Sequence, residues 1–249
     1  MSCPAPFSPI LQGVEDEEIP THLLQRRRRL ATIESDVKFT FPPGTFITSS
    51  LEGHGAYKFD GPEPRLRVAA GGPLGAVSLD LVVKAGDYRV RLPGRPDLLC
   101  EEDLCVIYGD SALIRTPGIL ARRPGLFFGG IPEEITADWV VSREGETKWL
   151  LPREGEETVR YLIEGDPPRI TKAIIKEKNL GMLTIFLEQW EETSAGPVPV
   201  KIVVKFDGRA LFSLKLRNVE IGGEVPESVF EMAFLSFRIF RVDTAIIPQ

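Results

Sequence analysis

The sequence has 249 residues, enough for one large β domain or two smaller ones, and it can bury a substantial core without disulfide support. Its formal net charge of -6 and its pI near 5.2 argue against a protein that binds nucleic acid by neutralising phosphates. No apolar run reaches the length of a transmembrane helix, and no cleavable signal peptide is recognised.

Residues 1–19 combine a proline-rich start, "MSCPAPFSP", with the acidic run "VEDEE", and we expect them to form a flexible linker. Residues 20–249 are expected to form a single domain. Cys3 follows a small serine, as in a bacterial lipoprotein whose leader has been removed and whose cysteine carries lipid. An ordinary exposed cysteine is the alternative, and the nine residues leave both open.

Pro20 and Thr21 predict the start of a helix over the stretch "THLLQRRRRLATIE", which has one apolar face. The run Arg26–Arg29 goes right round this helix, so we predict a solvated helix flank. Contact with anionic lipid near an N-terminal anchor is the alternative interpretation.

From Val37 onward the hydrophobic period changes to two, which predicts strands with one apolar and one charged face. Such strands are expected in "VKFTF", between residues 45 and 59, in "RLRVA", "VSLDLVV" and "YRVRL". Leu74 is unusual, because "GGPLG" places it at a turn tip, where Gly, Asn, Asp or Ser is typical. Cys100 and Cys105 form either a small disulfide loop or two buried thiols, and they make a poor zinc site.

Residues 109–141 do not follow the hydrophobic period of two, and we predict two short helices there. Thr116 and Pro117 are typical of a helix start, as is Pro132 followed by Glu133 and Glu134. Strands then resume, separated by charged or glycine-bearing turns, among which the Asp-Gly of "FDGRA" predicts a hairpin. The expected fold is mainly β: a half-open antiparallel β-barrel formed by one strongly curved sheet, with a few short helices on its concave side.

A search for catalytic chemistry finds little. "GDSAL" contains Ser111 in a hydrolase-like context, but the only histidines, His22 and His54, both lie upstream in the chain. Ordinary turn chemistry explains this stretch better, and acidic pairs such as Glu133–Glu134 are typical of solvated surface. No phosphate loop, dinucleotide fingerprint or metalloprotease motif is present. We therefore expect a protein that is not an enzyme and uses no cofactor or metal.

The order of elements resembles the LolA/LolB-like lipoprotein-carrier superfamily, and within it most closely the LolB type. The stretch "YKFDGPEPRLRVAAGGPLGAVSLDLVV" resembles the family's hairpin and protruding-loop region. "GGIPEEITADWVV" is similar to its second short helix, and "VPESVFEM" to the segment that ends many of its barrels. The tail 233–249 and the two cysteines have no counterpart in the family.

The resemblance implies an apolar cavity, lidded by helices, that receives the acyl chains of lipoproteins or lipids. It places Leu74, between Pro73 and Gly75, as a membrane-inserting loop residue; the alternative is that Leu74 folds back onto a neighbouring strand. It also implies a lipid anchor at Cys3, a position on the periplasmic face of the bacterial outer membrane, and a periplasmic lipoprotein carrier as a partner. The cavity is expected to be lined from strand faces that hold Phe39, Phe41, Leu66, Val68, Leu79, Leu81, Val90 and Trp149, although a one-residue shift would reverse each face.

Three interpretations compete. The first is a lipid-anchored carrier or receptor that helps to localise lipoproteins, and the second is a carrier of free lipid on the same scaffold. The third is a structural or assembly lipoprotein of the outer membrane, whose filled barrel serves as a protein-interaction module. A hydrolase is a distant fourth.

Overall fold

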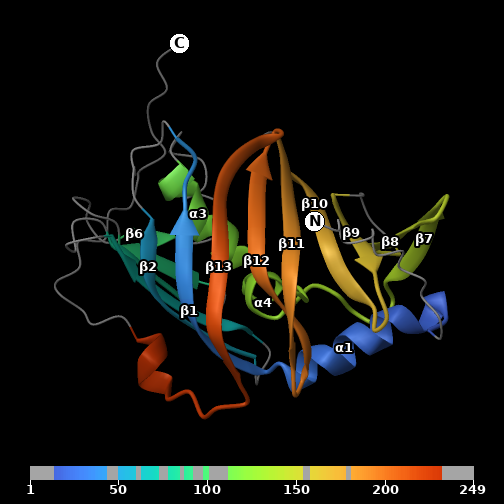
Figure 1. Ribbon diagram of the computed structural model, residues 1–249, viewed down its shortest axis with the longest axis horizontal. Coiled ribbons are helices and arrows are strands. Elements are labelled where there is room, and N and C mark those ends of the chain that lie inside the picture. The colour runs from blue at the N-terminus through green and yellow to red at the C-terminus, as the bar shows by residue number, and fades with distance from the viewer. Residues whose placement is uncertain are drawn as a thin grey trace, which may run out of the picture.

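The computed structural model of the protein describes residues 14–43, 50–59, 63–72, 78–84, 87–91, 98–100, 112–153, 158–177 and 181–231. These residues form one curved antiparallel sheet with helices on one side (Figure 1). The sheet has 13 strands in the order β6-β5-β4-β3-β2-β1-β13-β12-β11-β10-β9-β8-β7. Each pairing is antiparallel, so the predicted mainly β, strongly curved sheet with a few short helices is confirmed.

The strands run in two meanders that meet in the middle of the sheet. The first meander consists of β1 (Thr32–Thr40), β2 (Leu51–Lys58), β3 (Arg65–Gly71), β4 (Ser78–Lys84), β5 (Asp87–Arg91) and β6 (Leu98–Cys100). The second consists of β7 (Val140–Glu144), β8 (Thr147–Leu151), β9 (Val159–Glu164), β10 (Arg169–Glu177), β11 (Gly181–Thr193), β12 (Gly196–Phe206) and β13 (Arg209–Ile221). The first strand pairs with the last, for example Phe39 with Leu214, and this pairing joins the two halves.

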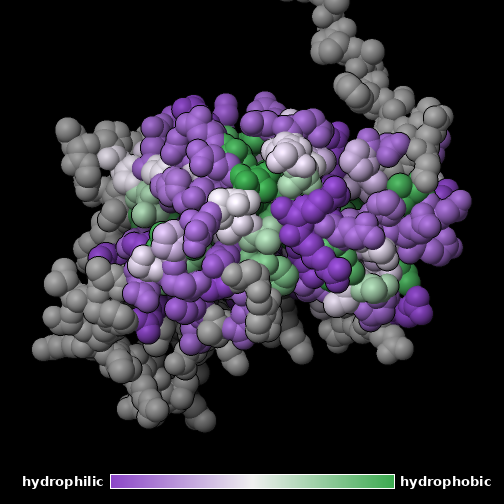
Figure 2. Space-filling model, turned by 90° about the horizontal axis from the view of Figure 1, so that it is seen from below, coloured by the Kyte–Doolittle hydropathy of each residue, from purple (hydrophilic) through white to green (hydrophobic). Residues whose placement is uncertain are grey.

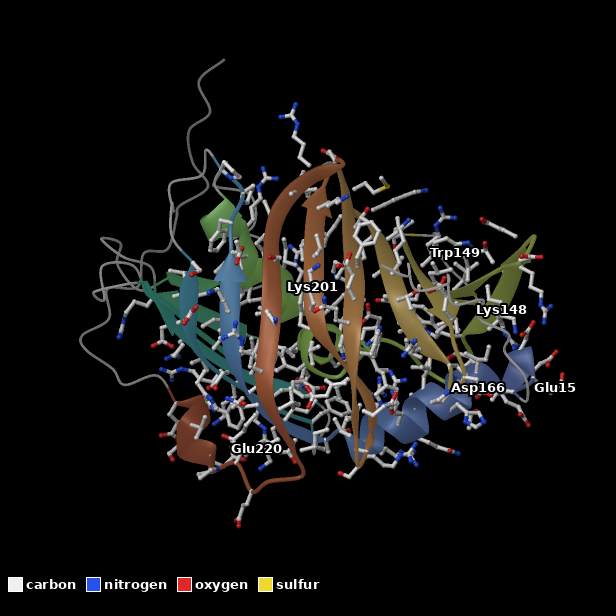
Figure 3. The ribbon with its side chains drawn as sticks, viewed as in Figure 1. Glu15, Lys148, Trp149, Asp166, Lys201 and Glu220 are labelled. Carbon is white, nitrogen blue, oxygen red and sulfur yellow. The ribbon has the colours of Figure 1, made fainter. Side chains whose placement is uncertain are left out.

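Side chains alternate between the two faces because the strand period is two, except at bulges such as the one between Glu34 and Asp36 in β1. On β1, Val37 and Phe39 point into the core while Lys38 stays on the other face. We call the face that carries the helices concave and the opposite face convex. Lys201 projects from the convex face, which is turned toward the viewer in Figure 3.

The hairpin predicted at Asp207 and Gly208 is confirmed between β12 and β13. Asp207 has a φ of 46° and Gly208 a φ of 76°, as a two-residue type I′ turn requires at both central positions. The Asp207 carboxylate also accepts a hydrogen bond of 2.7 Å from the Met182 amide, which links this turn to the start of β11.

The helices are α1 (Ile19–Arg29), α3 (Ala112–Arg122) and α4 (Pro124–Phe128), with short 3-10 turns η1 (Asp16–Glu18) and η3 (Glu227–Phe230). The predicted first helix is confirmed but ends at Arg29, because β1 begins three residues later. Thr116 and Pro117 do not start a helix; Pro117 lies inside α3. A further short helix that was not predicted, α4, begins at Pro124, where the missing N–H costs no helical hydrogen bond.

No helix forms at Pro132, contrary to prediction. The carbonyls of Pro132, Glu133 and Ile135 all accept hydrogen bonds from the Arg27 guanidinium, at 3.0, 2.8 and 3.2 Å. A helical turn would instead direct these carbonyls to amides further along the chain. Residues 131–139 therefore follow turns and extended backbone up to β7.

The connection between the two meanders crosses the whole concave face. It leaves from β6 and returns at β7, and these two strands are the opposite edges of the sheet. Helices α3 and α4 belong to this connection and lie behind the sheet in Figure 1. We call residues 112–139, its described part, the crossing segment. The chain passes between the two edges of the sheet on this side, so the crossing segment covers the concave face.

Candidate functional site

The concave face of the sheet is apolar across both meanders, which we call its first wing (β1–β6) and its second wing (β7–β13). Seven of the eight predicted lining residues lie on this side in the main hydrophobic core, each at most 8% exposed: Phe39, Phe41, Leu66, Val68, Leu79, Leu81 and Val90. Register explains the grouping, because Val68 faces Leu81 across β3 and β4, and Leu81 faces Val90 across β4 and β5. That these residues line a ligand cavity stays a prediction.

Trp149 lies on the other side of the sheet, so its assignment to the concave face is corrected. Its neighbour Leu150 pairs with Tyr161, and both belong to the core. Because successive side chains alternate, Trp149 points to the convex face, where the Arg160 guanidinium lies 4.4 Å from its ring centroid. The predicted face was shifted by one residue in β8.

The crossing segment fills the concave side with its own aromatic rings. Phe127 stacks on Phe212 of β13 with ring centroids 6.4 Å apart, and Phe128 stacks on Tyr57 of β2 at 6.3 Å. Both phenylalanines are fully buried. Figure 2 shows the molecule from below, where hydrophilic side chains surround smaller hydrophobic patches. The apolar concave face is thus covered by α3 and α4 of the crossing segment, of which α3 contacts β4, β5 and β13, and α4 contacts β2 and β12.

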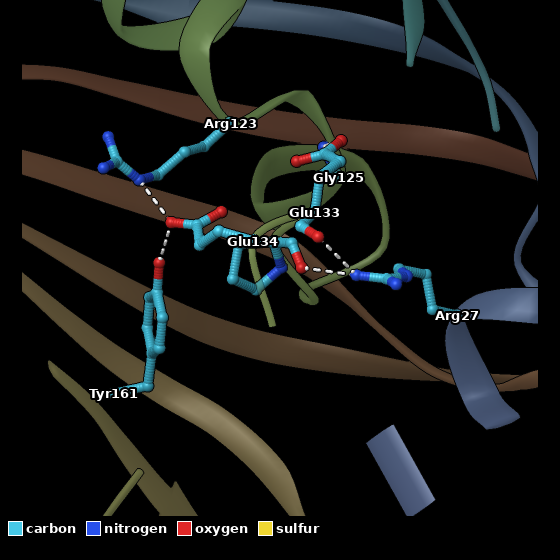
Figure 4. Close-up of polar contacts among 7 residues, drawn as sticks. Arg27, Arg123, Gly125, Glu133, Glu134 and Tyr161 are labelled. Atoms are coloured by element: carbon cyan, nitrogen blue, oxygen red, sulfur yellow. Dashed lines mark hydrogen bonds and ion pairs between the residues drawn. The ribbon is translucent and has the colours of Figure 1, made fainter. Parts of the chain in front are cut away.

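Glu133, drawn beside Gly125 and Arg27 in Figure 4, fastens the crossing segment to the first wing of the sheet through Tyr57. Its Oε1 atom accepts hydrogen bonds from the Tyr57 hydroxyl at 3.1 Å and from the Gly125 amide at 2.6 Å. Its Oε2 atom is enclosed and has no hydrogen-bond partner among the described residues. Burial raises the pKa of Glu133 to about 7, and repulsion from Glu134 adds to this, whereas its hydrogen bonds act in the opposite direction.

Glu134 fastens the same segment to the second wing. Its Oε1 atom accepts a 2.5 Å hydrogen bond from the Tyr161 hydroxyl on β9, and the Arg123 guanidinium lies 2.7 Å from the same oxygen. Burial, followed by the neighbouring carboxylates, raises the pKa of both Tyr57 and Tyr161, so both stay protonated and donate. We call Tyr57, Glu133, Glu134 and Tyr161 the polar clasp. It joins β2 and β9 through two consecutive carboxylates.

The arginine run is not the solvated flank that was predicted. Arg26 is only 3% exposed, and Arg27 holds the backbone of residues 132–135 as described above. Only Arg28 and Arg29 are exposed. The pair Glu133–Glu134 is likewise not a solvated surface pair. The sequence offered one indication of these contacts in Tyr57 and Tyr161. A tyrosine at a core-facing strand position needs a hydrogen-bond partner for its hydroxyl.

Several predicted site residues lie outside the described residues: Cys3, the loop Pro73, Leu74 and Gly75, Cys105, and Ser111. Cys100 ends β6, where it pairs with Tyr88, but its side chain is not described. Lipidation, membrane insertion and the disulfide therefore stay predictions.

The described residues contain no group of three or more His, Cys, Asp or Glu side chains placed to hold a metal ion. None of the helices in this part of the chain combines the length and hydrophobicity needed to cross a bilayer. His54 lies on β2, with Glu34 and Asp36 3.5 and 3.6 Å from its ring nitrogens, on an exposed part of the sheet.

Together, the two meanders, the edge-to-edge crossing and the apolar concave face define a LolA-like fold. The crystal structure of a DUF1329 family protein from Desulfovibrio piger matches with a TM-score of 0.59 at 13% identity, over 87% of this chain and 95% of that one. A LolA superfamily protein from Nitrosomonas europaea matches with a TM-score of 0.52 at 14% identity, over 90% of this chain and all of that one. The sequence itself matches no protein-family model and no curated protein sequence.

Proposed function

We propose that this protein is a carrier that binds the acyl chains of lipids or lipoproteins on the concave face of its sheet. The observation that carries the proposal is a continuous apolar face covered by a single connection rather than by a second sheet. An acyl chain gains about 0.8 kcal/mol for each methylene that leaves water, so such a face can bind it without polar recognition. The fold similarity to a LolA superfamily protein agrees with this use.

Binding requires that the crossing segment move aside. The rings of Phe127 and Phe128 occupy the concave side, and their departure would expose an area suited to an acyl chain. The polar clasp is a small set of hydrogen bonds at the end of the segment that can be broken and remade. No covalent step is needed, because a chain passes between two apolar sites according to their difference in affinity.

The cellular setting is a narrower part of the same proposal. Lipid attachment at Cys3 would tether the domain to the periplasmic face of the outer membrane through the linker 1–19. Leu74 would insert reversibly into acyl chains, and the clients would be lipoproteins delivered by a periplasmic carrier, as in the LolB type. Sequence resemblance supports this setting, and mass analysis of the N-terminal peptide after expression with a lipoprotein leader tests the anchor.

The test of acyl binding is photo-crosslinking with a fatty acid that carries a diazirine in its chain. We expect labelled peptides from the concave face, around Val68 and Leu81, in saturable amounts that unlabelled fatty acid competes away. The internal control is the convex face: when the crosslinks are assigned to single residues by tandem mass spectrometry, Trp149 and Lys201 should stay unlabelled. Equal labelling of both faces, or no saturable labelling, would contradict the proposal.

A structural or assembly lipoprotein is the second candidate, and the packing of the concave face favours it. Phe39, Leu66 and Val68 are fully buried against the protein's own side chains, as in a filled barrel. Under this alternative, partners bind the outer surface and no acyl chain enters. The photo-crosslinking experiment separates the two, and loss of lipoproteins from the outer membrane on depletion would distinguish a lipoprotein client from free lipid.

A further inference from the structure

At the lower end of the sheet, α1 passes the turn between β9 and β10 and buries an arginine there. Asp166, in that turn, lies beside α1 in Figure 3. Arg26 is 3% exposed and donates from Nη1 to the Pro168 carbonyl at 3.0 Å. Its Nε and Nη2 atoms are enclosed and have no hydrogen-bond partner among the described residues. One hydrogen bond therefore serves a guanidinium that can donate five.

A second arginine and a tryptophan complete the same cluster. Arg169 is the first residue of β10, and its guanidinium carbon lies 5.2 Å from the centroid of the Trp190 ring, while that of Arg26 lies 5.9 Å from it. The Nε atom of Arg169 and the indole Nε1 of Trp190 are also enclosed and unpartnered within the described part of the chain. Two cations thus share one indole, and donors on all three side chains lack an acceptor.

No carboxylate of the described residues lies within ion-pair distance of either guanidinium, although the chain as a whole is acidic. Burial, and after it repulsion from Arg169 and Arg29, lowers the pKa of Arg26 to about 10, while attraction to Glu192 acts in the opposite direction. The Arg26 guanidinium is therefore still charged at neutral pH. Positive charge is therefore concentrated here without a matching negative group.

Such an arrangement is costly for a purely structural cluster. A buried guanidinium without partners loses its hydrogen bonds to water and gains none in the protein interior. Apolar side chains of similar volume would stabilise the fold better. Guanidinium groups bind phosphate oxygens through charge-assisted and often bidentate hydrogen bonds, and the indole N–H adds a neutral donor. We propose that Arg26, Arg169 and Trp190 form a binding site for a phosphate group, supplied either by a lipid headgroup or by free phosphate.

The position of the cluster connects it to the concave face. Trp190 packs against the main hydrophobic core, and a Cβ atom added at Gly130 of the crossing segment would lie 3.0 Å from its ring. A phosphate held beside Trp190 thus lies at the rim of the proposed acyl site. That a phospholipid places its headgroup here and its chains on the concave face rests on the proposed function, whereas the phosphate site itself does not.

The test is isothermal titration calorimetry at constant ionic strength with two probes, inorganic phosphate and dihexanoylphosphatidic acid below its micelle concentration. The variants are Arg26→Gln and Arg169→Gln, and the matched control is Arg28→Gln, which removes an equal charge from an exposed position of α1. Loss of one charge-assisted hydrogen-bonding group should weaken phosphate binding about tenfold in each test variant. The Arg28→Gln variant should bind as the wild type does.

The two probes distinguish the sources of the phosphate. Tighter binding of the phosphatidic acid than of inorganic phosphate, with both weakened in the variants, identifies a lipid headgroup, and equal binding identifies free phosphate. Absence of binding by both probes, or equal weakening in Arg28→Gln, overturns the site. Arg169 is only half-buried, so its variant tests the proposal even if Arg26→Gln fails to fold. Phosphate binding without acyl photo-crosslinking would retain this site and reject the acyl carrier.

Discussion

At the scale of single residues, Glu133 makes stability depend on pH in an unusual direction. Its pKa is raised to about 7 in the folded protein, so the folded state holds a proton that the unfolded chain releases near its ordinary value of 4.5. The unfolded state therefore binds fewer protons between these values, and stability falls as pH rises through that window. Below the window both states are protonated, and the penalty is absent.

We expect Glu133→Gln to remove this dependence. The glutamine keeps an oxygen for Tyr57 and Gly125 but cannot ionise. The free energy of unfolding of the variant, minus that of the wild type, should therefore rise by on the order of 3 kcal/mol from pH 4.5 to pH 8. Urea unfolding at a series of pH values measures the difference. The control is Glu144→Gln on the exposed hairpin of β7 and β8. A difference that does not change with pH would show that Glu133 is not a buried titrating group.

At the scale of elements, sequence reasoning was most successful where periodicity is strong. The strands around Val37, Leu66 and Tyr88 show clean period-two alternation, and the structure places them as predicted. It failed where a distant side chain takes over local backbone groups. Arg27 binds the carbonyls of residues 132–135 and so replaces the predicted helix by turns. No pattern within residues 131–139 could reveal a partner more than a hundred positions away.

The hairpin between β12 and β13 offers a clean test of backbone conformation. Gly208 has a φ of 76°, and a Cβ added there would meet nothing within 4 Å. Gly208→Ala should therefore cost only the strain of the left-handed conformation, about 1 kcal/mol in urea unfolding. Gly223→Ala is the control, because that glycine lacks a positive φ and its added Cβ would contact only Glu34 at 3.8 Å. Equal losses in both variants would contradict the assignment.

The contact between β2 and α4 leaves no room for a methyl group. A Cβ at Gly55 would lie 2.7 Å from two ring atoms of Phe128 and 3.0 Å from Val37. We expect Gly55→Ala to destabilise the protein by about 1–3 kcal/mol, since overpacking forces α4 to shift. In a double-mutant cycle with Phe128→Ala, most of this loss should disappear, because the opposing ring is gone. Additive losses would place the cause elsewhere in β2.

At the scale of the whole molecule, the arrangement of the meanders was harder to predict than the strands themselves. Antiparallel order within each half follows from short turns, but the pairing of β1 with β13 joins residues about 180 positions apart. That pairing makes β6 and β7 the two edges, and the described part of the connection between them, residues 112–139, lies over the concave face. This topology brings Glu133 and Glu134 to the distant Tyr57 and Tyr161 and so forms the polar clasp. Because those partners are far away in the chain, the sequence predicted that the two glutamates lie on the surface.

Both wings of the sheet thus hold the crossing segment over the concave face, because the polar clasp has one tyrosine on each wing. Tyr57 and Tyr161 anchor the crossing segment from β2 and β9, so loss of both hydroxyls should free it without removing either ring. In Tyr57→Phe/Tyr161→Phe we expect a fluorescent fatty-acid probe to associate about tenfold faster in stopped-flow mixing at pH 8, which is above the pKa of Glu133. Each lost hydrogen bond to a charged group removes roughly 1.5–3 kcal/mol of the free energy that holds the segment in place, and part of this appears in the opening rate. Each single variant should give a smaller increase. An association rate that stays unchanged in the double variant would show that the probe binds without opening the segment, and the acyl site would then have to lie away from the concave face.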